Sequence, residues 1–151
     1  MAAALQLVGD RWALLVIREL MFGNHRFAGL ARNTGAPRDR LAARLRDLEA
    51  GGVIERRQYQ ERPVRFEYHL SEAGRDLTPV VQALFAWGDK WAVEDPPVVL
   101  RHSCGHGLVA SMRCAHCGEP VRGGELAFES RDAGWDVHGP VEPEMSEHSG
   151  R

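Results

Sequence analysis

From residue 10 onward, the apolar positions of the chain recur mainly at helical spacing, which is the pattern of amphipathic helices that share one core. Asp10 is a good N-cap for the first of these runs. Pro37 falls in the first turn of the third run, which Gly51 and Gly52 end. The pattern predicts helices over residues 11–22, 26–33, 37–50 and 71–91.

Two segments between the third and fourth of these helices carry β-formers instead, with partial alternation of apolar and polar residues. They cover residues 53–59 and 65–70, and a proline-bearing connection over residues 60–64 joins them into a hairpin. Helices followed by a hairpin and one more helix predict an α+β fold, mainly α, of the winged helix–turn–helix type. We place this domain at residues 1–95, because a proline pair follows it.

The third predicted helix and the hairpin concentrate arginines. On that helix Leu41, Leu45 and Leu48 form a stripe that anchors one face to the core, and the arginines lie largely off the stripe. A B-DNA major groove admits one α-helix, and guanidinium groups suit guanine edges and phosphate oxygens. We therefore expect residues 37–50 to enter the major groove and the hairpin to lie on the backbone or in the minor groove. The residues assigned to DNA contact are Arg26, Pro37, Arg38, Arg40, Arg44, Arg56, Arg57, Arg62 and Arg65.

The 151-residue chain has a net charge of −2, which by itself does not suit a polyanionic partner. Residues 1–93, however, contain 14 Lys and Arg against 11 Asp and Glu, whereas residues 94–151 contain 5 against 10. Only the first part is therefore suited to double-stranded DNA. Apolar residues make up 44% of the chain, but no apolar run is long enough for a membrane span and no export signal is present. We expect a cytoplasmic protein with no membrane partner.

All three cysteines lie close together in the sequence, at Cys104, Cys114 and Cys117, among several histidines. An odd number of cysteines without an export signal disfavours disulfides, and the pattern Cys-x-x-Cys-Gly suits a turn that holds Zn²⁺. Because a closed tetrahedral site needs four ligands, we predict a Cys₃His site in which His106 is the favoured fourth ligand and His102 its competitor. The zinc is expected to be structural, since the sequence has no His-x-Glu or His-Glu-x-x-His pattern.

The region after the winged helix divides into two predicted parts. Residues 96–130 are expected to form a zinc-ribbon-like β extension with short strands at residues 98–100 and 108–109. Residues 131–151, rich in Gly, Pro, Ser and acidic residues, predict a disordered acidic tail.

Five sequence blocks in the first part of the chain carry a family resemblance. They are Leu5–Leu20 with its Val-Gly-Asp-Arg-Trp, Arg26-Phe27, Leu41–Glu49, Tyr68–Gly74 with its Leu-Ser-Glu-Ala-Gly, and Trp87-Gly88. Over roughly residues 4–93 the chain resembles the HxlR-type winged-helix transcriptional regulators. The resemblance implies a homodimeric DNA-binding regulator whose dimer contacts come from the first and last helices of the domain. It equates the recognition helix with Pro37–Ala50 and the wing with Glu55–Leu70.

Many members of that family carry a sensor cysteine just before the first helix. The sequence starts at Met1, already inside the matching region, and that cysteine is absent from it. Whether a sensor cysteine lies upstream is left open, as are the operator, an unidentified small-molecule effector and the sign of regulation.

Two other functions compete with the DNA-binding regulator. One is a protein–protein interaction module built on a winged helix that has lost DNA binding, and the weaker one is a zinc hydrolase. The sequence has no Gly-rich phosphate loop, no Gly-x-Ser-x-Gly elbow and no candidate pair of catalytic carboxylates, so we expect no enzyme activity.

Overall fold

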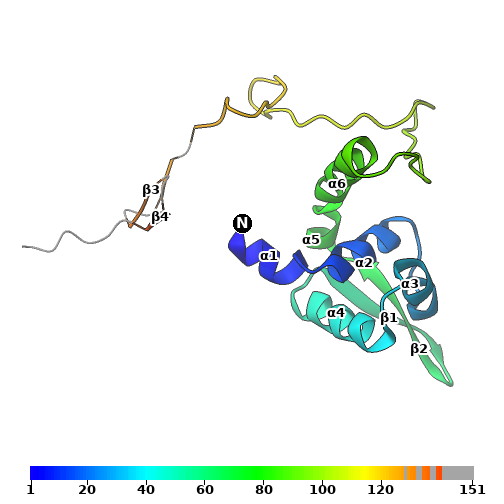
Figure 1. The fold of residues 1–151 in the computed structure, drawn as a ribbon. Coiled ribbons are helices and arrows are strands. Elements are labelled where there is room, and N and C mark those ends of the chain that lie inside the picture. Colours follow the sequence, from blue (N-terminus) through cyan, green and yellow to red (C-terminus); the bar gives the residue numbers. More distant parts are fainter. Residues whose placement is uncertain (128, 132–133, 137–138, 141–151) are drawn as a thin grey trace, which may run out of the picture. The chain divides into compact units, whose positions relative to one another are not determined.

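The structure is a computed structural model that describes residues 1–127, 129–131, 134–136 and 139–140 (Figure 1). The chain divides into two compact units, Met1–Ala110 and Ser111–Arg151. The first unit contains α1 (Ala2–Val8), α2 (Arg11–Met21), α3 (Phe27–Thr34), α4 (Arg38–Ala50), β1 (Ile54–Glu61), β2 (Val64–Leu70), α5 (Glu72–Arg75) and α6 (Thr78–Trp91). The second contains β3 (Trp135–Asp136) and β4 (Gly139–Pro140). No helix in the described part combines the length and the apolar character that crossing a membrane requires.

The element order of the first unit confirms the winged helix–turn–helix prediction. The Asp10 carboxylate accepts a hydrogen bond of 2.8 Å from the backbone N–H of Trp12, so the predicted N-cap of α2 is confirmed. The helix α4 begins one residue later than predicted. Pro37 has an extended ψ of 140° and is the N-cap residue rather than part of the first turn. Gly51 ends α4 as expected.

The predicted single helix over residues 71–91 is wrong, because the chain forms two helices there. Ser71 caps the short α5 by accepting a hydrogen bond of 3.1 Å from the backbone N–H of Gly74. Pro79 stands in the first turn of α6. Proline has no N–H to donate to the preceding turn and its ring crowds that turn, so a continuous helix cannot pass through this position without strain.

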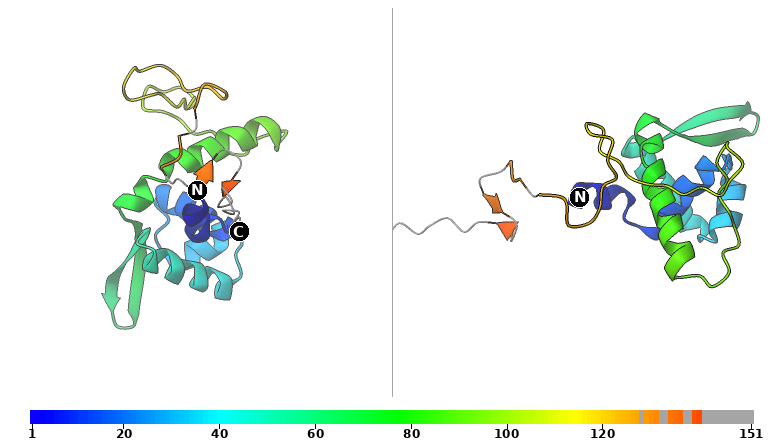
Figure 2. Two further views of the ribbon diagram at one scale, coloured as in Figure 1. Left: turned by 90° about the vertical axis from the view of Figure 1, so that its left-hand side faces the viewer. Right: turned by 90° about the horizontal axis from the view of Figure 1, so that it is seen from above.

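The hairpin is longer than predicted. The antiparallel register runs from Ile54 opposite Leu70 to Glu61 opposite Val64, with an irregularity between residues 58 and 60. The connection therefore shrinks to residues 62–63, and the hairpin projects from the helices in each view (Figures 1 and 2).

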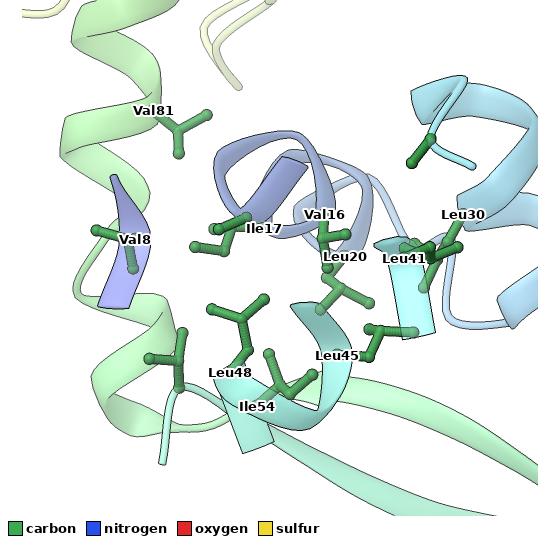
Figure 3. Close-up of a cluster of buried hydrophobic side chains, with 13 residues drawn as sticks. Val8, Val16, Ile17, Leu20, Leu30, Leu41, Leu45, Leu48, Ile54 and Val81 are labelled. Carbon is green, nitrogen blue, oxygen red and sulfur yellow. The ribbon is translucent and has the colours of Figure 1, made fainter. Parts of the chain in front are cut away.

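The core of the first unit lies between α2, α4 and β1, with one residue each from α1, α3 and α6 (Figure 3). The predicted stripe Leu41, Leu45 and Leu48 is buried, at 0%, 2% and 0% exposed. It packs among Ile17 of α2 and Ile54 of β1. Burying a side chain of this size contributes about 1.5–3 kcal/mol. The same leucines therefore hold α4 in place and turn its arginines outward.

The region after α6 forms turns joined by single β-bridges where short strands were predicted. Pro96, residues 98–100 and residues 107–108 line a pocket together with α6, and the compact unit extends to Ala110. The bridges pair Arg101 with Gly107 and Arg113 with Pro120. The predicted tail, residues 131–151, falls largely on residues outside those described, although β3 and β4 pair within it.

Gly74 generates a stability prediction. A Cβ at this buried position would overlap the carbonyl oxygen of Val53, which already accepts a hydrogen bond of 3.1 Å from the backbone N–H of Ser71. We expect Gly74→Ala to reduce the free energy of unfolding by ~1–3 kcal/mol, the range typical of overpacking. Urea denaturation followed by circular dichroism measures the change.

Gly29 supplies the matched control, because a Cβ there meets no atom within 4 Å and the residue lies inside α3. Gly29→Ala should leave stability unchanged or raise it by up to ~1 kcal/mol. Equal stability of Gly74→Ala and the wild type would contradict the close approach of α5 to the start of the hairpin.

Candidate nucleic-acid interface

A turn fixed by hydrogen bonds joins α3 to α4. The Thr34 hydroxyl donates to the Leu30 carbonyl at 2.7 Å and accepts from the backbone N–H of Ala36 at 3.2 Å. Gly35 has φ of +67°, a left-handed conformation that favours glycine. Because Ala36 is buried, the turn is held against the core and sets the direction in which α4 leaves it.

The arginines of α4 differ in how available they are. Arg44 is only 31% exposed, and its guanidinium lies 2.8 Å from the Asp47 carboxylate. Arg38 and Arg40 are exposed in the first turn, and within the described residues neither forms an ion pair. Arg46, outside the predicted set, is exposed as well. The first turn of α4 is therefore its most accessible cationic part.

The wing arginines divide in the same way. Arg56 lies 3.5 Å from a carboxylate of α4, that of Glu49, and 4.4 Å over the Phe66 ring. Arg57 lies 2.9 Å from the Glu55 carboxylate. Two exposed arginines near the tip, Arg62 and Arg65, make no ion pair with any described residue. The tip is therefore the part of the wing with cations free for an external anion.

Arg26, at the start of α3, holds that helix to the wing. Its guanidinium donates to the Glu67 carboxylate at 2.9 Å and stacks 4.6 Å over the Tyr59 ring. This hydrogen bond is the main cause of two pKa shifts: it raises the pKa of Arg26 and lowers the pKa of Glu67. Arg26 thus has a structural partner as well as an exposed side chain.

Two histidines form a contact that the sequence analysis does not anticipate. The rings of His25 and His69 stack with centroids 4.2 Å apart, and His25 Nδ1 lies 2.8 Å from the Tyr68 carbonyl oxygen. The Tyr68 N–H donates in return to the His25 carbonyl at 2.9 Å. The contacts of His25 with His69 and Tyr68, like those of Arg26, fix the base of the wing to the segment before α3.

The cysteine region is organised as separate turns. Cys114 is half-buried, whereas Cys104 and Cys117 are exposed, and all three are free thiols. The backbone N–H groups of Cys117 and then His116 hydrogen-bond to the Cys114 sulfur, which lowers the pKa of that thiol. Within the described residues, no three His, Cys, Asp or Glu side chains are placed to share a metal ion. The predicted ligand set, with His106 as its fourth member, therefore stays a prediction.

Comparison with known proteins gives one family and consistent relatives. The family described as HxlR-like helix-turn-helix matches residues 7–96. An uncharacterized HTH-type transcriptional regulator of Mycobacterium tuberculosis (strain H37Rv) is 48% identical over 121 residues, covering 78% of this chain and 77% of the relative. The similarity to it is therefore longer than the family match. The uncharacterized HTH-type transcriptional regulator YtcD of Bacillus subtilis is 38% identical over 87 residues, covering 57% and 69%.

Solved structures agree with these sequence relatives. The crystal structure of PA1607 has a TM-score of 0.74 and 30% identity, and the match covers 85% of this chain and 91% of that one. The reduced form of the transcriptional regulator YodB from B. subtilis has a TM-score of 0.52 and 35% identity, over 64% of this chain and 95% of that one.

The histidine stack generates a prediction about pH. Burial lowers the pKa of His69, helped by His25 and Arg57, while Glu67 opposes the shift. A group with a depressed folded-state pKa contributes stability that is complete above its unfolded pKa of ~6.5 and is lost as pH falls through the folded value. The free energy of unfolding should therefore decrease as pH is lowered below about 6.5.

Urea denaturation at several pH values between about 5 and 7.5 tests this, because the ordinary carboxyl pKa values lie below that window. His69→Gln should reduce the pH dependence, and His116→Gln, which changes a histidine of the other unit, should preserve it. The same slope in His69→Gln and the wild type would show that the stack is not the source.

Proposed function

The chain belongs to the HxlR-like helix-turn-helix family, and we propose that it is a sequence-specific DNA-binding regulator that acts as a homodimer. Its relatives are transcriptional regulators, which are not enzymes. The observation that carries the proposal is the arrangement of exposed arginines, paired with no described carboxylate, on the first turn of α4 and at the wing tip. The core holds α4 and the base of the hairpin in place. This arrangement does not favour an interaction module without DNA binding, because such a module does not need exposed arginines on both the recognition helix and the wing.

In the proposed complex α4 enters the major groove. Recognition helices contact base edges through their N-terminal residues, which here are Arg38 and Arg40. Arg62 and Arg65 at the wing tip neutralise phosphates on the backbone or in the minor groove. Arg44 contributes after giving up part of its contact with Asp47.

The proposed dimer uses α6. Four of its residues, Val80, Leu84, Trp87 and Trp91, are 47%, 50%, 61% and 67% exposed. Their spacing of four, three and four residues is that of a helix–helix seam. Val81 and Phe85 on another side of the same helix pack against the core. Exposing an apolar stripe of this kind to water is unfavourable. The α6 helix of a second copy, related by two-fold symmetry, would bury it against an identical stripe.

A two-fold dimer would also explain how a short helix achieves specificity. One recognition helix and one wing contact few base pairs, whereas two of them related by symmetry read both halves of a pseudo-palindrome. We expect the two copies of α4 to lie ~34 Å apart, or a multiple of this, so that they meet successive major grooves on one face of the duplex.

We further propose a structural Zn²⁺ in the cysteine region, held by Cys104, Cys114 and Cys117 with one histidine. The support is the turn around Cys114, where two backbone N–H groups point at a sulfur as they do at a metal-bound thiolate. A closed Cys₃His shell would have no open position for a substrate, so a zinc hydrolase is not favoured.

The proposed recognition helix makes a mutational prediction. Arg40→Ala is expected to weaken binding to the cognate site by ~1–3 kcal/mol, and Arg44→Ala by a value toward the lower end of that range because of its contact with Asp47. DNA fragments selected from the organism's genome by the wild-type protein provide the site, and fluorescence anisotropy measures affinity.

Arg75→Ala serves as the control, because Arg75 lies on α5 at the base of the hairpin and donates to the Leu70 carbonyl. It should bind the same fragments as tightly as the wild type. Unchanged affinity of both Arg40→Ala and Arg44→Ala would mean that α4 does not read the DNA.

The proposed seam makes a second prediction. Trp87→Asp places a charge in the centre of the exposed stripe and should convert a dimer to a monomer at micromolar concentration, as measured by sedimentation. Val64→Asp alters a comparably exposed apolar residue in the wing, 57% exposed, and should remain dimeric. A monomeric wild-type protein, or a dimeric Trp87→Asp, would count against the seam.

A further inference from the structure

Residues 100–108 form a closed turn around Cys104. The N–H of Leu108 donates to the Leu100 carbonyl at 2.7 Å, and Arg101 forms a β-bridge with Gly107 one step further in. These contacts bring the two arms of the turn together. The turn is thus held by its own backbone rather than by a hydrophobic core.

Residues 112–121, around the other two cysteines, repeat this arrangement. The N–H of Val121 donates to the Met112 carbonyl at 2.9 Å, and Arg113 forms a β-bridge with Pro120 one step further in. The arginine of each bridge also donates its Nη1 to a glycine carbonyl of its own turn, at 3.3 Å in the first turn and 2.9 Å in the second. The two turns therefore share one backbone plan.

The shared plan places His102 where the second turn has Cys114. Each residue follows the bridge arginine, and each N–H donates across the turn at 2.9 Å, from His102 to the His106 carbonyl and from Cys114 to the Glu119 carbonyl. His102 is therefore the counterpart of a predicted metal ligand. His106 is the counterpart of Glu119, on the returning arm.

The plan also places Cys104 where the second turn has Cys117. Each cysteine precedes a glycine with positive φ, +86° at Gly105 and +74° at Gly118. The N–H of each glycine donates to the carbonyl of the first ligand position in its turn, at 2.9 and 2.8 Å. The left-handed glycine closes both turns behind the second ligand position.

Side-chain hydrogen bonds follow the same correspondence. The Cys104 N–H donates to His102 Nδ1 at 3.3 Å, and the Cys117 N–H donates to the Cys114 sulfur. In both turns the second ligand position thus directs its N–H at the side chain of the first. A thiolate sulfur can keep such a hydrogen bond when it binds a metal, whereas each imidazole nitrogen has a single lone pair, so His102 would give up its bond to Cys104 on binding Zn²⁺.

The difference in length between the turns fits the difference in ligand. One residue separates His102 from Cys104, whereas two separate Cys114 from Cys117. An imidazole nitrogen lies further from its backbone than a thiol sulfur does. A shorter loop with a longer side chain can therefore present its donor atom as a longer loop with a cysteine does.

Building on the proposed structural zinc, we propose that its fourth ligand is His102, so that two copies of one turn supply two ligands each. The site consists of His102, Cys104, Cys114 and Cys117 around one Zn²⁺, with expected distances of about 2.3 Å to sulfur and about 2.0–2.1 Å to nitrogen. His106, favoured by the sequence through its spacing from Cys104, is not a ligand in this arrangement. The residues between the turns serve as a linker.

The experiment compares His102→Ala with His106→Ala in the full chain, purified with reduced thiols and without chelator. Inductively coupled plasma mass spectrometry gives the zinc content, and competition with a chromophoric chelator gives the affinity. Wild type and His106→Ala should each hold one zinc per chain. Loss of hydrogen-bonded supports alone lowers metal affinity by about 10–100-fold, so loss of the ligand in His102→Ala should exceed ~100-fold.

Cobalt substitution adds a readout that does not depend on affinity. The visible bands of tetrahedral Co²⁺ should persist in His106→Ala and weaken in His102→Ala, where water replaces the imidazole. Cys117→Ser serves as the positive control for loss of a ligand. Circular dichroism and DNA binding establish that each variant retains a folded winged helix.

Each result decides between the proposals. Loss of metal from His106→Ala, or full retention by His102→Ala, would overturn the assignment of His102 while leaving the zinc proposal in place. A wild-type protein with no zinc would overturn both. In either case DNA binding by the wild type would stand on its own, because it is measured separately.

Discussion

The buried carboxylate of Glu19 fixes the geometry on which the helix–turn–helix depends. It is 4% exposed, and it accepts hydrogen bonds from Arg18 at 2.7 Å, Asn24 at 2.7 Å and Asn33 at 2.8 Å. A buried charge without partners would be severely unfavourable, so these donors cannot move away independently. Because they come from α2, from the turn after it and from the end of α3, one anion determines how α3 lies against α2. The short turn then passes this orientation on to α4.

Because the core fixes α4, the ability of each of its arginines to bind DNA depends on whether a carboxylate of the protein already binds that arginine. An arginine already paired with a carboxylate must exchange that partner for a phosphate or base, and the exchange returns less free energy than a new contact. An exposed, unpaired arginine neutralises a phosphate and releases counterions without such an exchange. The winged helix carries only a small excess of positive charge. Its capacity to bind DNA therefore depends on where the exposed arginines without a carboxylate partner lie, and among the described residues Arg40 and Arg62 are two of these.

Local features of the fold could be predicted from the sequence, and contacts between distant residues could not. The stripe of Leu41 and its neighbours follows from periodicity, and the Asp10 cap follows from its place before an apolar run. The break at Pro79 could also be predicted from the sequence, since proline inside a helical pattern interrupts the backbone hydrogen bonds of the helix. The partners of Glu19 and the stack of His25 on His69 could not be predicted from the sequence, because they depend on packing and on strand register. The pair of Arg44 and Asp47 is different, because residues three apart lie on one helix face and the sequence alone could have distinguished Arg44 from the other arginines.

The two cysteine turns show a similar limit on spacing as a guide to ligands. Counting residues from Cys104 favours His106, because short gaps between donors are common in metal sites. Backbone hydrogen bonds favour His102, because they show which residue occupies the same place as Cys114. The buried apolar core of the first unit, within the described residues, runs from Val8 to Val81 and includes neither turn. The free energy that holds the DNA-reading domain together therefore comes from that core, and a metal bound by the turns would stabilise the extension rather than the recognition helix.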